Sequence, residues 1–558
     1  VYGEWVGTMT QAKGGLNAPE AYRKEGRNMN WVWDNIITYD KTWKNIHHLN
    51  AIGLYSVQKE THKGSEMRGD GLPYNSDWHA IETAEEIRDV KSYYWESSML
   101  SFMGRVNYTL MDRYLFTVTG RYDGTSRLAT GNQWGFMPSA AVGWQMKNEN
   151  FLKNVDWLNS LKLRVSWGKS GNNSIDHDVT WTKLDLTHYI YGGKGENAFG
   201  LGDRKGNKGL RWEMTSEWNY GIDFGFLGNA LTFTVDYYQK KTNGMLKEMA
   251  IPNYLGESKP WGNVGSMKNE GVEFEVGYKY SHKDFRFGVN ANLSYLKNKL
   301  VDLGTADGFE MMDQVHILGN VGRAENGMPY PYFYGYKTAG IFQNQAEIDA
   351  YTNSKGEKLQ PLAVPGDVKF VDFDNDGTID DKDKTMIGKG TPDWTFGLNL
   401  TAAYKDIDFS VLFSGSLGQD IMDVTRRLDV SSVNVPQEFM KRWHGEGTSN
   451  TMPRFCYPGD DMNGNWKKVS DLYVHNGSFA RIKNMQIGYT LPKNLTRKFF
   501  VDRLRLYVAA ENLLTLTSYK GLDPEINATD VAGDKSNGID RGYYPQARTF
   551  TVGLNLNF

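Results

Sequence analysis

The last ten residues, 549–558, carry an apolar side chain at every second position and end on an aromatic residue. Side chains of a β-strand point to opposite faces in turn, so this segment offers one face to an apolar medium and the other to a polar one. The apolar face is formed by Phe550, Val552, Leu554, Leu556 and Phe558. A terminal strand of this kind favours an outer-membrane β-barrel, in which it would be the strand used for barrel assembly.

The same period of two recurs along the whole chain, which makes it a signal of the fold. Clear instances lie at 114–122, 161–167, 231–237, 285–295 and 394–400. We predict an all-β fold, a transmembrane antiparallel β-barrel to which residues 1–558 contribute about sixteen strands. The predicted ranges are 1–10, 27–41, 43–60, 93–110, 112–124, 133–146, 159–170, 213–227, 229–243, 265–281, 283–300, 393–406, 407–420, 477–491, 502–515 and 547–558.

Composition agrees with a membrane barrel. No apolar run approaches the ~18 residues of a membrane helix, and a barrel needs none because only half of each strand meets lipid. The 32 Tyr, 26 Phe and 17 Trp suit the aromatic girdles at the two membrane interfaces. A net charge of −3 offers no basic surface for nucleic acid. The single cysteine, Cys456, excludes an intrachain disulfide framework.

The connections between predicted strands alternate between short and long, which orients the barrel. Barrels of this kind have short periplasmic turns and long external loops. With a periplasmic C-terminus, the external segments are 61–92, 171–212, 244–264, 301–392, 421–476 and 516–546. Val1 is not an initiator methionine, and the first predicted strand starts at once. We therefore expect further barrel strands encoded upstream, since open edges in lipid cost several kcal/mol per unpaired group.

The longest external segment, 301–392, contains an acidic loop at 372–383 with the spacing of a calcium site. Acidic residues stand at positions 1, 3, 5, 9 and 12, glycine at the sharp turn at position 6, and threonine at position 7, whose carbonyl would be a ligand. The predicted calcium ligands are Asp372, Asp374, Asp376, Thr378, Asp380 and Asp383. Position 12 is Asp where Glu is commoner, which shortens its reach. We expect a structural calcium ion that staples the segment; an acidic turn without a cation is the alternative.

Motifs for catalysis are absent from the sequence: there is no HExxH, no GxSxG and no convergent acid, base and nucleophile set. We therefore predict that the chain is not an enzyme. Four loop tryptophans are compatible with stacking on sugar rings, but equally with interfacial girdles or loop cores. They are Trp181, Trp212, Trp261 and Trp466.

Ordered motifs across most of the chain resemble the SusC/RagA family of TonB-dependent transporters. The motifs lie at 121–127, 134–139, 263–273, 333–343, 366–369, Gly388, 392–397, 488–492, 511–513 and 521–525. The resemblance implies a 22-stranded barrel in the outer membrane of a Bacteroidetes-type bacterium. It also implies that about six strands, the plug domain and the TonB-contacting segment lie upstream of Val1, so that the plug is absent from this chain.

The resemblance further implies active import of large nutrients, glycan oligosaccharides or oligopeptides. A SusD-like surface lipoprotein would close over the barrel as a lid, and TonB-ExbB-ExbD would act through the upstream part. A passive porin or a surface adhesin barrel are the alternatives. A TonB box upstream would exclude the porin, and energy-dependent uptake would exclude the adhesin. Which glycan or peptide is imported stays open.

Overall fold

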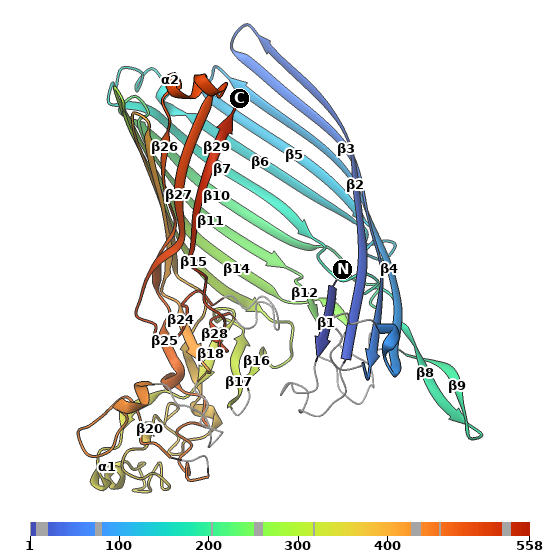
Figure 1. The fold of residues 1–558 in the computed structure, drawn as a ribbon, viewed down its shortest axis with the longest axis vertical. Coiled ribbons are helices and arrows are strands. Elements are labelled where there is room, and N and C mark those ends of the chain that lie inside the picture. The colour runs from blue at the N-terminus through green and yellow to red at the C-terminus, as the bar shows by residue number, and fades with distance from the viewer. Residues whose placement is uncertain are drawn as a thin grey trace. The chain divides into compact units, whose positions relative to one another are not determined.

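The computed structural model describes residues 2–6, 20–72, 81–201, 205–249, 260–315, 318–425, 437–456, 459–526 and 537–558. Its largest element is a sheet of sixteen strands that follow one another in chain order, apart from hairpins inserted between them (Figure 1). The strands are β1 Tyr2–Val6, β2 Glu20–Trp43, β3 His47–Asp70, β4 Glu86–Leu110, β5 Tyr114–Thr125, β6 Trp134–Gln145, β7 Leu158–Asn172, β10 Glu213–Phe226, β11 Leu231–Asn243, β14 Ser266–His282, β15 Phe285–Asp302, β22 Trp394–Tyr404, β23 Ile407–Leu417, β26 Phe479–Thr490, β27 Arg503–Thr517 and β29 Thr549–Asn557.

Each predicted strand range overlaps one strand of this sheet, and the all-β class is confirmed. Residues 1 and 7–10 of the first predicted strand lie outside the described residues. No helix within the described ranges has the length and apolar character needed to span a membrane.

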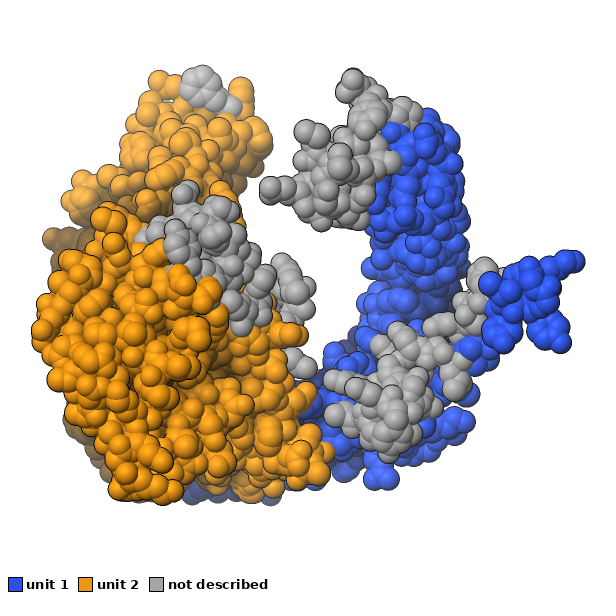
Figure 2. Space-filling view, turned by 90° about the horizontal axis from the view of Figure 1, so that it is seen from below, with its two compact units in different colours: residues 1–142, 166–216, 242–264 blue, residues 143–165, 217–241, 265–558 orange. Residues whose placement is uncertain are grey.

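The chain divides into two compact units, coloured in Figure 2. Unit 1 comprises 1–142, 166–216 and 242–264, and unit 2 comprises 143–165, 217–241 and 265–558. Outside the large sheet, unit 1 contains the hairpins β8 Leu184–Tyr191 with β9 Lys194–Leu201, and β12 Leu246–Glu248 with β13 Trp261–Asn263.

Residue pairing in the large sheet separates two chemically different faces. Between β22 and β23, Leu398 lies opposite Phe413 and Leu400 opposite Val411, while Thr401 lies opposite Ser410 on the other face. Residues directly opposite in an antiparallel pair share a face, so the period of two in the sequence becomes one continuous apolar surface and one polar surface.

Three strands of unit 1 are longer than their alternation predicts. β2, β3 and β4 have 24, 24 and 25 residues, so β3 and β4 continue into the predicted external segment 61–92. Ion pairs connect the extended ends of neighbouring strands. Arg68 of β3 pairs with Glu20 of β2, and Arg88 of β4 pairs with Asp70 of β3, each with an N···O distance of 2.7 Å. The alternation of apolar side chains stops where a strand leaves the lipid, but backbone pairing continues beyond that point. The observed strands are therefore longer than the predicted ranges.

The three long connections of unit 2 fold together into a loop module, which we define as the described residues within 303–393, 418–478 and 518–548. Its strands are β16 Phe309–Val315, β17 Gly319–Glu325, β18 Tyr332–Gly335, β19 Thr338–Ile341, β20 Val368–Phe370, β21 Thr385–Gly388, β24 Asp420–Asp423, β25 Val474–Asn476 and β28 Ile539–Asp540, with helix α1 Gln345–Ala350. The short helix α2 Lys493–Thr496 lies at the opposite, short-turn end.

Residues from all three connections share one hydrophobic core. Phe333, Met422, Trp466 and Ile539 are among its buried members, and Cys456 is another. The long loops therefore carry a core of their own, and a cation is not the only element that can hold their shape.

A buried arginine of the sheet anchors the last of these connections. Arg481 of β26 is 2% exposed and pairs with Asp523 at 2.5 Å and with Glu525 at 2.9 Å. Lys483 also pairs with Glu525, at 2.7 Å. Because a buried guanidinium needs anionic partners, the segment 523–525 is fixed against the polar face of the sheet.

The burial of Cys456 can be tested by thiol labelling. Burial raises the pKa of this thiol to about 11, so about one molecule in a thousand carries the thiolate at pH 8. We expect iodoacetamide to modify the native protein at least ~100-fold more slowly than the protein unfolded in guanidinium. Cys456 is the only cysteine, so the mass increase reports this site alone. Equal rates in both states would show that the loop module lacks the core described above.

Candidate functional site

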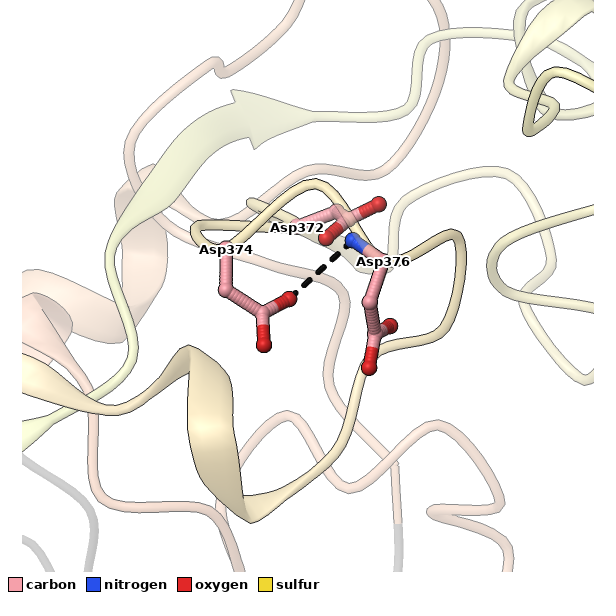
Figure 3. Close-up of side chains that lie close together, drawn as sticks. All are labelled: Asp372, Asp374 and Asp376. Carbon is pink, nitrogen blue, oxygen red and sulfur yellow. Dashed lines mark hydrogen bonds between the residues drawn. The ribbon is translucent and has the colours of Figure 1, made fainter.

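The acidic loop begins directly after β20 and ends in a short 3-10 helix, Asp381–Asp383. Three of its carboxylates converge: one oxygen each of Asp372, Asp374 and Asp376 lies within 4.8 Å of the others (Figure 3). Asp374 and Asp376 are exposed and Asp372 is half-buried.

Backbone amides hold these carboxylates in place. Gly377 N–H donates to Asp372 Oδ2 at 3.0 Å, and Asp376 N–H donates to Asp374 Oδ1 at 3.1 Å (Figure 3). Gly377 has φ +92°, a backbone conformation that favours glycine at the sharp turn. The loop is therefore preorganised by its own hydrogen bonds, with the carboxylates turned toward one another.

The remaining predicted ligands have structural roles. Asp383 is fully buried and accepts hydrogen bonds from Phe373 N–H at 2.6 Å and from Asp380 N–H at 2.7 Å. Asp380 caps the short helix by accepting from Lys382 N–H at 2.8 Å. The structure thus brings together three of the six predicted ligand residues; Asp383 closes the loop through backbone amides.

The donor set suits a hard cation. Asp372 Oδ1 is buried and has no hydrogen-bond partner among the described residues, which is a position that a cation can satisfy. The hydroxyl and amide of Thr378, followed by Lys382, lower the pKa of Asp376 from its ordinary value. The lowered pKa favours the ionised form of Asp376, which is the form that a calcium ligand needs.

A buried polar network, not foreseen from the sequence, joins two parts of the loop module. Asp367 is fully buried and accepts from Arg454 Nε at 2.6 Å, Asn465 Nδ2 at 2.8 Å and Val364 N–H at 2.9 Å. Asn465 in turn accepts from Val368 N–H at 2.8 Å. The motif at 366–369 contains Asp367, but its partners lie about ninety residues further along the chain, so no local pattern indicates the pairing.

A recess of about 1210 Å³ opens in the loop module beside β19. Its charged lining residues are Asp423, Glu438, Lys441, Asp471 and Lys520, and His475 also lines it. Asp471 is held in place by Thr338, whose hydroxyl donates to it at 2.6 Å and whose N–H donates at 3.1 Å. Carboxylates and amines side by side with amides and methionines suit a polar, oligomeric ligand.

The four tryptophans considered for sugar stacking do not line this recess. Trp466 and Trp212 are buried members of hydrophobic cores, and Trp181 is exposed beneath the amine of Lys208 at 5.1 Å. Sequence reasoning missed the recess because its lining comes from six separate stretches of the chain.

The strand-rich wall with one apolar and one polar face defines an outer-membrane barrel protein. The family described as "TonB dependent receptor-like, beta-barrel" matches residues 2–513, and the chain belongs to this family. The resemblance drawn from the motifs is thereby confirmed, as are the outer-membrane location and the assignment to a class of receptors rather than enzymes.

Known relatives extend the comparison. The chain is 33% identical over 543 residues to TonB-dependent receptor P3 of Formosa agariphila, covering 95% of this chain and 52% of the relative. It is 32% identical over 484 residues to TonB-dependent receptor SusC of Bacteroides thetaiotaomicron, covering 85% and 45%. Among solved structures, the RagAB peptide transporter has the same fold, with a TM-score of 0.79 at 24% identity, covering 97% and 56%. The chain therefore spans about half the length of these relatives.

Removal of the Arg454 guanidinium beside Asp367 should loosen the loop module. We expect Arg454→Met to leave a buried carboxylate without its guanidinium, which costs about 3 kcal/mol. Amide hydrogen exchange across 364–371 should then speed up about 100-fold in the detergent-solubilised protein.

Arg442→Met is the matched control, because its guanidinium contacts only the Phe439 carbonyl at 3.4 Å among the hydrogen bonds found in the described residues. Unchanged exchange in the Arg454 variant would mean that Asp367 does not depend on that ion pair.

Proposed function

We propose that this chain is the barrel part of an active importer that takes large polar nutrients, glycan oligosaccharides or oligopeptides, across the outer membrane. The observation that carries the proposal is the polar recess of about 1210 Å³, held in the loop module of a TonB-dependent receptor barrel. Its size and mixed charge support an oligomeric ligand over a small ion.

The description of one structural neighbour supports the peptide class. SusC is a TonB-dependent receptor, and RagAB is described as a peptide transporter. The described lining of the recess contains one aromatic residue, Tyr519, which is 5% exposed. The carboxylates and amines of the recess can pair with the charged groups of a peptide, and they can equally form hydrogen bonds with the hydroxyls of a glycan.

The proposed importer needs partners that act together with this chain. A SusD-like surface lipoprotein would cover the loop module as a lid, and TonB-ExbB-ExbD would supply energy through a plug domain. In this proposal, the plug and about six further strands of a 22-stranded barrel would lie in the half of the relatives' length that this chain does not span. The loop module lies at the end of the sheet opposite the short turns, where a lid would dock.

Calcium is proposed as a structural ion of the acidic loop. Asp372, Asp374 and Asp376 would hold it, and a bound divalent cation would neutralise their mutual repulsion. The loop follows β20, which packs in a core with Tyr336 and Ile341. The ion would therefore stabilise this core, which lies next to the recess, and it would not contact the substrate.

Co-purification followed by uptake tests the proposed function. We expect tagged protein from native outer membranes, in mild detergent, to bring with it the upstream plug-bearing sequence and a surface lipoprotein. Uptake of a labelled oligomer identified in that preparation should stop when a protonophore is added. Uptake that persists without the proton gradient would establish a passive porin, and binding without uptake an adhesin.

Neutralising two carboxylates should strongly weaken calcium binding. We expect Asp374→Asn together with Asp376→Asn to weaken calcium affinity on the order of 100-fold, because two of three charges are lost. Titration calorimetry on the purified protein measures the change. Asp349→Asn is the control, since Asp349 pairs with Lys358 at 2.6 Å outside the acidic loop. Absence of calcium binding to the unaltered protein at millimolar calcium would refute the site.

The acid limit of calcium binding follows from the lowered pKa of Asp376. A carboxylate whose pKa is lower in the folded than in the unfolded protein stabilises the loop above its unfolded pKa, and this contribution is lost as the pH falls through the folded value. We expect the calcium affinity to stay constant from about pH 7 to pH 5 and to fall only below about pH 4. A loss that begins near pH 6 would point to a different titrating group.

A further inference from the structure

Three glycines stand side by side on the apolar face of unit 1. Gly53 of β3 lies opposite Gly104 of β4, and Gly104 lies opposite Gly120 of β5. A Cβ atom on Gly53 or Gly104 would meet no other atom within 4 Å. The wall is hollowed there into a groove of about 500 Å³.

The backbone does not require glycine at these positions. None of the three has a positive φ, and the only register shift in these strand pairs lies at Arg68 and Gly69, far along β3. Glycine within a strand is destabilising relative to alanine, because it loses more backbone conformational freedom on folding. Without a turn or bulge to explain it, a glycine in a strand marks a close approach of another molecule to the backbone.

The groove opens toward lipid and not toward the polar interior. Most of its lining residues share the face of Val106 and Val118, which are 46% and 61% exposed, whereas Asn107 and Thr119 lie on the opposite face. Leu54 and Met103, which pair with each other, are the two lining residues whose side chains alternate to that opposite face. The lining residues are Asn35, Ile37, Gly53, Leu54, Tyr55, Phe102, Met103, Gly104, Gly120 and Tyr122. In an outer-membrane barrel the apolar face is the one that meets the hydrocarbon of the bilayer.

A belt of aromatic rings borders the groove on the side of the long loops. Consecutive ring centroids lie 6.5 Å apart for Trp33 and Tyr55, 5.4 Å for Tyr55 and Phe102, 6.2 Å for Phe102 and Trp134, and 4.7 Å for Trp134 and Tyr122. Aromatic belts mark the boundary between hydrocarbon and head groups. The groove therefore lies directly below the external membrane interface.

We propose that this groove holds one acyl chain of a lipid of the external leaflet, with its head group at the aromatic belt. The groove is continuous with the lipid-facing surface of the wall and crosses four neighbouring strands, a span of about 14 Å. Within a bilayer, association depends on van der Waals packing, and small residues let the partner approach the backbone closely. A chain lying over Gly53 and Gly104 gains contacts with both walls of the groove that a flat surface does not offer.

Filling the groove tests the proposal independently of any transported substrate. Gly53→Val with Gly104→Val places two side chains in the open space. Val106→Leu with Val118→Leu is the matched control, which enlarges side chains on the same face outside the groove. The protein, purified from native membranes, is placed in bilayer discs of dipalmitoyl phosphatidylethanolamine and examined by native mass spectrometry after detergent release.

We expect the unaltered protein and the control to retain one phosphatidylethanolamine that the glycine variant loses, with at least 10-fold faster lipid dissociation in the variant. Equal retention in all three proteins overturns the proposal. A glycine variant that changes from dimer to monomer with its lipid count unchanged also overturns it, in favour of a second copy of the chain. If the valine variant does not assemble, the Gly53→Ala and Gly104→Ala pair should still shorten lipid retention.

Discussion

Every other feature of this protein depends on the need to pair backbone amides inside a hydrocarbon layer. No water is available there, so each strand must find its partners in neighbouring strands, and sixteen strands do so in simple chain order. This pairing forces side chains to alternate between lipid and the polar face. The polar face can then carry charged groups such as Arg481, whose carboxylate partners hold an external segment to the wall.

The loop module obeys a different rule, that of a water-soluble domain. Its segments bury a common hydrophobic core around Phe333, Trp466 and Ile539, and they satisfy a fully buried carboxylate, Asp367, with a guanidinium and an amide. Breaking such a buried pair is costly, so the module resists rearrangement at this point. A rigid module gives the recess beside β19 a defined shape, which selective binding of a large polar ligand requires.

The candidate sites differ in how far a local pattern reveals them. The acidic loop was predicted residue by residue because calcium loops place their ligands within twelve consecutive positions. Even there, Asp383 lies fully buried against backbone amides, since it ends the short helix that Asp380 caps and its side chain turns back to accept from the Asp380 amide. The recess and the Asp367 network could not be predicted, because their members are separated by up to about 180 residues and meet only after folding.

By itself, the sequence determined the strands and their two faces, because a period of two is set by local backbone geometry and by the contrast between lipid and water. It also determined the family through its ordered motifs. Only the tertiary structure decided how far β2, β3 and β4 extend beyond the lipid, which loops share a core, and where the lipid-facing wall is hollow. These features depend on strand register and on contacts between distant segments, and neither leaves a periodic trace in the chain.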